Sequence, residues 1–207
     1  MPWKFERVTS STIILGEGRD EAELLEAMAQ AMGLQVQCVD CGGSQQFHIR
    51  LKVVMAAPGF DRVTSLGVVR DAETNSAAAE ESIRGRLAAE GLAVPDKPMT
   101  RATAPDSPDV AFLVVPSGEP AGMMEDLILR AMKDDPSWKC QQAYFDCLAL
   151  TGIDLTSDPQ KRRVQAALAA LPSGNLARNI GEAARKGLIP FGHPGLSELS
   201  DFLTLVT

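Results

Sequence analysis

The sequence lacks any long hydrophobic run. No segment approaches the roughly 18 consecutive apolar residues that a membrane-spanning helix needs, and residues 1–6 lack the apolar stretch of a secretory signal. Hydrophobic residues make up 45% and charged residues 23% of the 207-residue chain, a balance that excludes an intrinsically disordered protein. We therefore expect a globular protein of the cytoplasm that has no membrane partner.

Cysteine and histidine are also scarce. The four cysteines are Cys38, Cys41, Cys140 and Cys147. They are too few and too scattered for a disulfide framework, so we expect reduced thiols, and a single C-x-x-C pair without a second pair does not support a zinc site. The two histidines, His48 and His193, adjoin no obvious nucleophile, which favours structural roles over a hydrolase triad.

Positive charge is in deficit but unevenly distributed. The net charge is −7 and the pI is near 4.9, which argues against a protein that binds nucleic acid through its overall charge. Residues 159–190, however, contain six basic residues and a single acid, Glu182. This segment could form a basic surface beside an acidic pocket, or it could consist of two solvated helix faces.

Short apolar segments alternate with segments of helical periodicity. Strands are expected at 12–16, 35–39, 65–70 and 110–115, and helices at 20–32, 45–55, 76–90 and 123–132. Alternation of this kind predicts right-handed crossovers and a parallel sheet that is covered by helices on both faces.

The remaining segments complete the predicted α/β fold. The four prolines of residues 93–109 indicate a loop or an edge hairpin, and the chain is helical by periodicity from Trp138 onwards. We therefore predict an α/β domain over residues 4–133 and a helical C-terminal region, residues 134–207, that packs on it.

Three acidic residues follow predicted strands. Glu17 follows the first strand, and Asp71 and Glu73 follow the third. The carboxyl ends of parallel strands meet at one sheet edge, and residues two apart on an extended chain point to the same side, so all three could reach one ion. The alternative is that Glu17 and Asp71 stabilise helix N-termini while Glu73 is solvent-exposed. Three acids in two separate turns favour a site for a hard cation such as Mg²⁺.

These segments resemble the Toprim fold of topoisomerases, bacterial primases and overcoming-lysogenisation-defect (OLD) nucleases. Residues 13–21, IILGEGRDE, resemble its strand–Glu–Gly turn, and residues 68–73, VVRDAE, resemble its Asp-x-Asp strand with Glu at the last place. The Gly42-Gly43 turn and residues 122–126, GMMED, are similar to small stand-alone Toprim-like proteins of uncharacterised function. The resemblance covers most of the chain.

The resemblance implies a site for magnesium or manganese. In it, Glu17 would act as general acid, general base or ligand, and Asp71 and Glu73 would be ligands. Glu125 and Asp126 could hold a second ion, as a further acidic patch does in related nucleases, or they could be ordinary first-turn acids of a helix.

The sequence also departs from the Toprim pattern. Glu73 replaces the commoner Asp, which adds one methylene to a ligand, and Gly16 stands where related proteins often have a bulkier residue. The only tyrosine, Tyr144, lies in the predicted C-terminal helices and not where a topoisomerase has its nucleophile. We therefore expect neither topoisomerase nor primase activity.

Basic residues near the acids suggest contacts with a phosphate. Lys161 and Arg162 begin a predicted helix, where cations are unfavourable for the helix dipole, and Arg19 adjoins the first acidic turn. With Gly43 they are the candidate substrate-binding residues. The leading hypothesis is Mg-dependent phosphodiester chemistry of a nuclease or phosphotransfer enzyme, on nucleic acid or a nucleotide phosphate, with a partner protein such as an ATPase. The alternative is a non-catalytic module that binds a nucleotide or a protein.

Overall fold

A five-stranded sheet forms the centre of the molecule. The computed structural model describes residues 5–153, 157–171 and 176–207. The strands are β1 (Thr12–Gly16), β2 (Gln37–Asp40), β3 (Ser65–Asp71), β4 (Arg101–Ala102) and β5 (Asp109–Val115). Their order is β2-β1-β3-β5-β4, with β1, β2, β3 and β5 parallel and the short β4 antiparallel to β5 at one edge. The prediction of a parallel α/β sheet is confirmed, and the segment 93–109 contains the edge strand.

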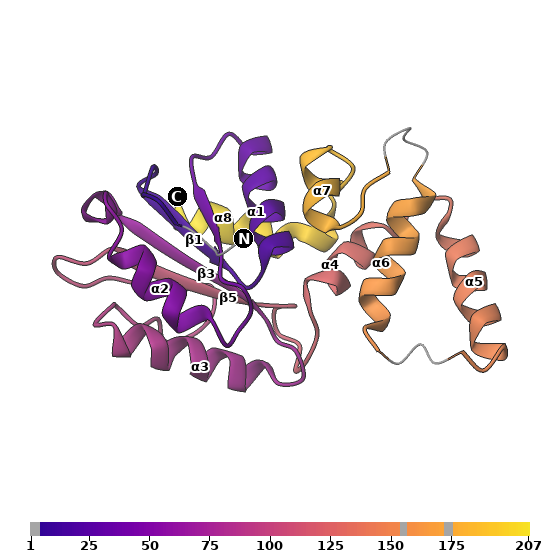
Figure 1. Ribbon diagram of the computed structural model, residues 1–207, viewed down its shortest axis with the longest axis horizontal. Helices are drawn as coiled ribbons and strands as arrows, with labels where there is room; N and C mark the ends of the chain where they lie inside the picture. Colours follow the sequence, from indigo (N-terminus) through magenta and orange to yellow (C-terminus); the bar gives the residue numbers. More distant parts are fainter. Residues whose placement is uncertain (1–4, 154–156, 172–175) are drawn as a thin grey trace.

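Helices cover both faces of this sheet (Figure 1). The α-helices are α1 (Arg19–Ala31), α2 (Phe47–Met55), α3 (Ser76–Ala89), α4 (Met124–Ala131), α5 (Trp138–Leu150), α6 (Pro159–Ala170), α7 (Ile180–Arg185) and α8 (Ser197–Val206), and the short helices η1 (Phe60–Arg62) and η2 (Pro194–Leu196) are of the 3-10 type. Helices α2 and α3 lie on one face, and α1 and α8 lie on the other. Each predicted boundary lies within two residues of the observed one, as is usual at frayed element ends.

The two faces of the sheet form two hydrophobic cores. Along β1, Ile13 and Leu15 pack with α2 and α3, whereas Ile14 packs with α1 and α8. All five residues of β1 and all seven of β3 are buried, as expected for central parallel strands that are covered on both sides. This covering leaves the ends of the strands as the accessible part of the sheet.

The last helix returns to the sheet from the C-terminal region. The ring of Phe202 in α8 is fully buried, and its Cζ would lie 3.1 Å from a Cβ built on Gly67 of β3. Glycine in the middle of β3 therefore leaves the room that the ring fills. Residues 197–206 thus complete one face of the α/β core.

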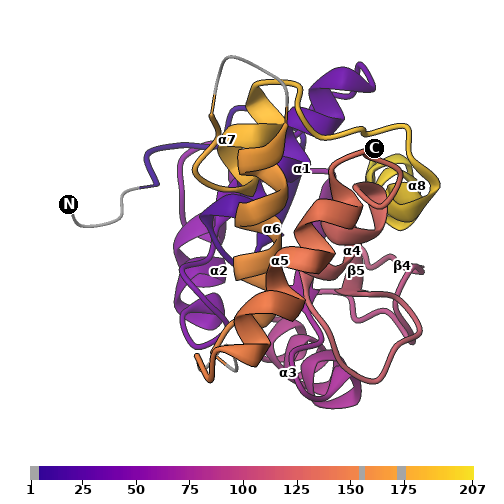
Figure 2. The ribbon, with the colours of Figure 1, turned by 90° about the vertical axis from the view of Figure 1, so that its right-hand side faces the viewer.

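The remaining helices extend the molecule beyond the carboxyl ends of the strands. Helices α5 and α6 lie side by side and project away from the sheet, and α6 also packs on α4 (Figures 1 and 2). Helix α7 packs on α1, where Arg185 forms an ion pair with Glu23. Within the described residues, no helix is long and apolar enough to cross a membrane.

Candidate functional site

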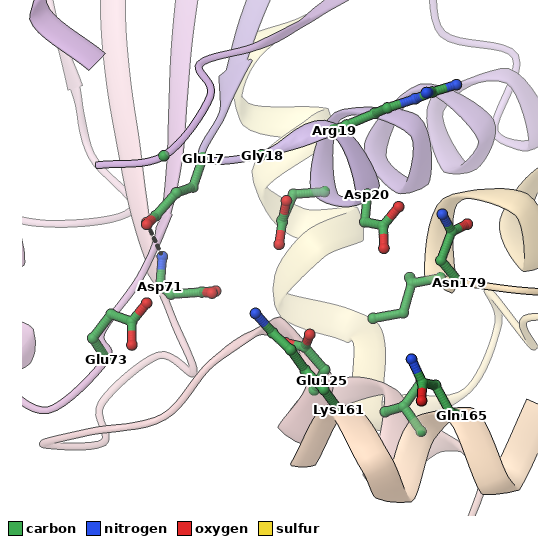
Figure 3. A pocket seen from close by; sticks show the side chains of 14 residues that line it. Glu17, Gly18, Arg19, Asp20, Asp71, Glu73, Glu125, Lys161, Gln165 and Asn179 are labelled. Atoms are coloured by element: carbon green, nitrogen blue, oxygen red, sulfur yellow. Dashed lines mark hydrogen bonds between the residues drawn. The ribbon is translucent and has the colours of Figure 1, made fainter. Parts of the chain in front are cut away.

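A cavity of about 380 Å³ opens at the carboxyl end of the sheet, between the strand ends and α6 and α7. It is called the carboxylate cavity here because six acidic residues line it, against two cations, Arg19 and Lys161. The acids are Glu21 and the five that Figure 3 labels, namely Glu17, Asp20, Asp71, Glu73 and Glu125. The three acids predicted from the sequence therefore line one cavity.

Glu17 joins the ends of β1 and β3. Its Oε2 accepts a hydrogen bond from the backbone N–H of Asp71 at 3.3 Å (Figure 3). The same oxygen lies 3.5 Å from Nε of Arg70. The side chains of Arg70 and Glu17 are only 8% and 12% exposed, so this ion pair is largely screened from solvent. Loss of one partner would leave an uncompensated buried charge.

Asp71 is the last residue of β3 and is buried. Its Oδ1 accepts a hydrogen bond of 2.9 Å from the backbone N–H of Met124, the first residue of α4. Burial first, and then the neighbouring carboxylates of Glu21 and Glu17, raise the pKa of Asp71 to about 9. Near neutral pH this carboxyl group therefore holds a proton unless a cation is close to it.

Glu73 reaches the cavity in a way that the sequence did not predict. The prediction that Asp71 and Glu73 lie on one extended strand is wrong, because β3 ends at Asp71 and Glu73 has a left-handed backbone with φ of 51°. Two backbone hydrogen bonds with Gly122, of 2.7 and 2.8 Å, hold this conformation. The side chain of Glu73 is exposed at the rim.

Asp20, Glu21 and Glu125 are cavity acids contributed by helix starts. Burial raises the pKa of all three, and each also experiences the negative charge of neighbouring acids. Glu125 is 6% exposed, and its Oε2 is buried without a hydrogen-bond partner among the described residues. No role was predicted for Asp20 and Glu21 from the sequence, although both lie within the segment 13–21 that carries the Toprim resemblance.

Asp126 does not face the carboxylate cavity. Its Oδ2 accepts a hydrogen bond of 2.9 Å from the backbone N–H of Met123 and so caps the start of α4. It lines a neighbouring cavity instead, so the pair predicted to hold a second ion is divided between two cavities.

The predicted phosphate-binding residues also separate. Lys161 lines the carboxylate cavity, and although burial lowers its pKa, the charges of Glu125 and nearby acids raise it overall. Arg162 instead donates hydrogen bonds to the backbone oxygen and Oγ of Ser157, where it stabilises the entry to α6. Arg19 pairs with Glu23 at 2.7 Å and extends away from the cavity centre (Figure 3).

Two glycines shape the turns that carry the acids. Gly43 lines the cavity with φ of 97°, and its N–H donates a 2.8 Å hydrogen bond to the backbone oxygen of Glu17. A Cβ on Gly16 would lie 3.0 Å from the backbone nitrogen of Ala22, so the close approach of α1 to the end of β1 accounts for glycine before Glu17.

Several polar and apolar residues of the cavity wall come from the C-terminal helices. Gln165 and Val164 belong to α6, and Asn179 caps α7 by accepting a hydrogen bond from the N–H of Glu182. Asn directly before a short helical segment is a recognisable capping signal, but nothing in the local sequence places it beside Glu17 and Asp71.

The residues set aside in the sequence analysis have structural roles or none at this site. Nδ1 of His193 accepts a hydrogen bond from the N–H of Gly195 and its Nε2 lies 3.2 Å from Asp134. All four cysteines are free: Cys41 is buried and Cys38 is half-buried, whereas both cysteines of α5 are exposed.

Within the described residues, no group of three or more His, Cys, Asp or Glu side chains is arranged to hold a metal ion directly. The six acids share a cavity without converging on one point. Ligation by three of these side chains at once would require side-chain rotation.

Comparison with known proteins identifies a family. The family described as "Protein of unknown function (DUF3226)" matches residues 11–207. A search of curated proteins finds no match.

Solved structures of two OLD proteins resemble this chain at low sequence identity. The C-terminal region of the Burkholderia pseudomallei OLD protein is 13% identical with a TM-score of 0.50, over 96% of this chain and 98% of that one. The C-terminal region of the Xanthomonas campestris pv. campestris OLD protein is 11% identical with a TM-score of 0.47, over 95% and 96% of the two chains. At 13% identity the first likeness concerns the fold alone.

Proposed function

Because the chain belongs to the DUF3226 family of proteins of unknown function, we propose its activity from its own site: metal-dependent cleavage of a phosphodiester bond at a Toprim-like carboxylate cavity. One observation carries the proposal, namely that acids from the turn after β1, from the end of β3 and from α1 and α4 line one cavity at the carboxyl edge of a parallel sheet. Ligands of α/β sheets bind at this edge because the loops that follow the strands converge there.

The donor set fits Mg²⁺ or Mn²⁺. Carboxylate oxygens suit these hard ions, and Glu125 Oε2 is a buried acceptor that has no partner within the described chain. Mg²⁺ commonly binds through one or two carboxylates and keeps several waters, so it needs no preformed group of three acids. A volume of about 380 Å³ has room for those waters, which occupy roughly 30 Å³ each in the liquid.

The residues divide into those that would hold the ion and those that would act on the substrate. Asp71 and Glu125, with Glu21 and Glu73 at the same cavity, would hold it, and the ion would supply positive charge to the phosphate oxygens. Lys161 would orient a non-bridging phosphate oxygen. Glu17 would accept or donate a proton through Oε1, since Oε2 is engaged by Arg70 and the Asp71 N–H.

Substitution of Asp71 by Asn tests this proposal. The amide oxygen of Asn can still accept the hydrogen bond from Met124, but it carries no charge to hold a cation. We expect Asp71→Asn to lose Mn²⁺ and Mg²⁺ binding by calorimetry and hydrolysis of single- and double-stranded DNA. Glu81→Gln removes an exposed acid of α3 far from the cavity and should keep both.

Glu17→Gln is a second and more demanding test. It should also abolish hydrolysis, but it leaves the buried Arg70 guanidinium without its charge partner, so the variant needs a circular-dichroism check of folding. Full hydrolytic activity in folded Glu17→Gln or Asp71→Asn would contradict the proposal.

A non-catalytic binding module is the second candidate. It is favoured by the engagement of Glu17 with Arg70 and the Asp71 N–H, which gives this acid a structural role. Such a module would bind a nucleotide or a protein partner at the same cavity. Metal binding at millimolar concentration without hydrolysis of any DNA, RNA or nucleotide phosphodiester would favour the module.

A further inference from the structure

A second cavity, of about 590 Å³, lies beside the carboxylate cavity and is lined by α4, α5, α6 and the turn at Gly122. Glu73 lines both cavities and stands between them. We call it the tryptophan cavity, after Trp138 in its wall. Its volume is within the range of roughly 300–1,000 Å³ that is typical of small-molecule sites.

Its charge is balanced, whereas that of its neighbour is strongly negative: three acids, Glu73, Glu119 and Asp126, and three cations, Arg130, Lys133 and Arg163, line it. Arg130 pairs with Glu119, and Asp126 is used as the cap of α4. Lys133 and Arg163 also line this cavity, and neither has an acidic partner within ion-pair distance among the residues that the structure describes. Both side chains are therefore available to pair with an anion in this cavity.

An aromatic side chain completes the wall. Trp138 is half-buried at the start of α5, where it packs against the hydrophobic core and also lines the cavity. Because packing against the core already restricts the side chain of Trp138, it loses little conformational entropy when a planar ring stacks on it. The amides of Gln142 and Gln160, in the same wall, can donate to and accept from the edge of such a ring.

Arg163 is also anchored. Its guanidinium lies 4.7 Å from the centre of the Phe145 ring, which holds it between α5 and α6. A positioned guanidinium binds phosphate better than a freely moving one, because less side-chain entropy is lost on binding.

From these features we propose that the tryptophan cavity binds one nucleotide of a single-stranded nucleic acid. The base stacks on Trp138, and its phosphate lies between Lys133 and Arg163. The nucleic-acid strand then passes Glu73, and its next phosphate enters the carboxylate cavity. A single strand fits because its bases are free to leave their stack, whereas those of a duplex are not. The placement of the next phosphate rests on the proposed function, but the binding itself does not.

Binding can be measured without catalysis. A fluorescein-labelled oligothymidylate of about twelve nucleotides is titrated with the full chain in EDTA, and anisotropy reports the affinity. We expect Trp138→Leu to weaken binding roughly tenfold, through loss of stacking, and Lys133→Ala about fivefold, through loss of a phosphate contact. Lys139→Ala is the matched control, since Lys139 is an exposed lysine of α5 that does not line the cavity, and it should bind as the unmodified chain does.

A second readout locates the base. The chain has two tryptophans, so in a Trp3→Phe background Trp138 is the sole indole, and stacking should quench its fluorescence. Lys133 is exposed, so Lys133→Ala tests the proposal even if Trp138→Leu folds poorly. Equal weakening by Lys133→Ala and Lys139→Ala, or the absence of both quenching and binding, would overturn the site.

Competition distinguishes a strand from a free nucleotide, which share the same base and phosphate. If thymidine monophosphate displaces the labelled oligonucleotide at the same concentration as the unlabelled oligonucleotide does, the proposal of a single-strand site is wrong. The cavity would then be a mononucleotide site. Failure of the nucleotide site can also be distinguished from failure of the proposed nuclease activity. If the unmodified chain binds the oligonucleotide in EDTA but does not hydrolyse it with any metal, the nucleotide site stands and the nuclease proposal fails.

Discussion

Asp71 makes the folded protein sensitive to pH in an unusual direction. The pKa of an ordinary Asp carboxyl is 3.8, and the fold raises that of Asp71 to about 9, chiefly by burial and then through the charges of Glu21 and Glu17. Between these values the unfolded chain carries an ionised Asp71 and the folded chain a protonated one, so folding takes up a proton. The free energy of unfolding should therefore fall as pH rises, and the loss is complete only above the folded pKa.

The magnitude follows from the size of the shift. One pH unit within this window changes the contribution of Asp71 by about 1.4 kcal/mol, which makes roughly 4 kcal/mol between pH 4 and pH 7 as an upper bound. Titration shared with Glu21 and Glu125 spreads the change over a wider range of pH. The side chain of Asn cannot ionise, so Asp71→Asn does not have the free-energy cost of taking up a proton on folding. We therefore expect this variant to be more stable than the unmodified chain at neutral pH in EDTA.

Urea denaturation of both chains at pH 5, 6, 7 and 8 measures this difference. Because all other groups are common to the two chains, the difference in the free energy of unfolding isolates Asp71, and we expect it to grow with each step. Addition of Mg²⁺ should stabilise the unmodified chain and leave Asp71→Asn unchanged, since a nearby cation favours the ionised carboxylate. A difference that does not vary with pH, or an Asp71→Asn chain that is less stable at every pH, would refute the reasoning.

Three further predictions concern packing and reactivity. Gly16→Ala should cost about 1–3 kcal/mol in urea denaturation, because its Cβ would meet the backbone of α1, whereas Gly85→Ala, on an open face of α3, should add up to about 1 kcal/mol. Phe202→Ala should cost about 3–5 kcal/mol by the same assay, and a smaller loss would show that α8 contributes little to the core. With an aromatic disulfide reagent, the exposed thiols of α5 should react at once. Cys41, whose pKa burial raises to about 12, should react only on unfolding, and its fast labelling in the native state would contradict this.

The α/β fold could be predicted because each of its elements has a local signal. Buried parallel strands are continuous apolar runs, as in residues 12–16 and 110–115, and the helices between them show a period of about 3.6 residues. The meeting of Glu17 and Asp71 was expected only if their two strands are neighbours, and the parallel pairing of β1 with β3 meets that condition. The apolar runs of the strands and the periodicity of the helices depend only on residues close together in the chain.

The conformation of Glu73 had no such signal. Its left-handed backbone depends on hydrogen bonds to Gly122, which lies 49 positions later in the chain, and two-residue spacing therefore led to the wrong geometry. The same holds for Arg162, whose charge at a helix start suggested a phosphate contact but which is used in a local hydrogen bond to Ser157.

The closure of the cavity and the protonation of Asp71 depend on contacts across the whole chain. Composition and periodicity determine which segments are strands and helices, because local backbone preference and the burial of apolar side chains act along the chain. They do not determine how α6 and α7 enclose the acids, nor that α8 completes the core through Phe202 against Gly67. A pKa near 9 requires the burial and the neighbouring charges that come from distant segments, and these exist only once the chain has folded.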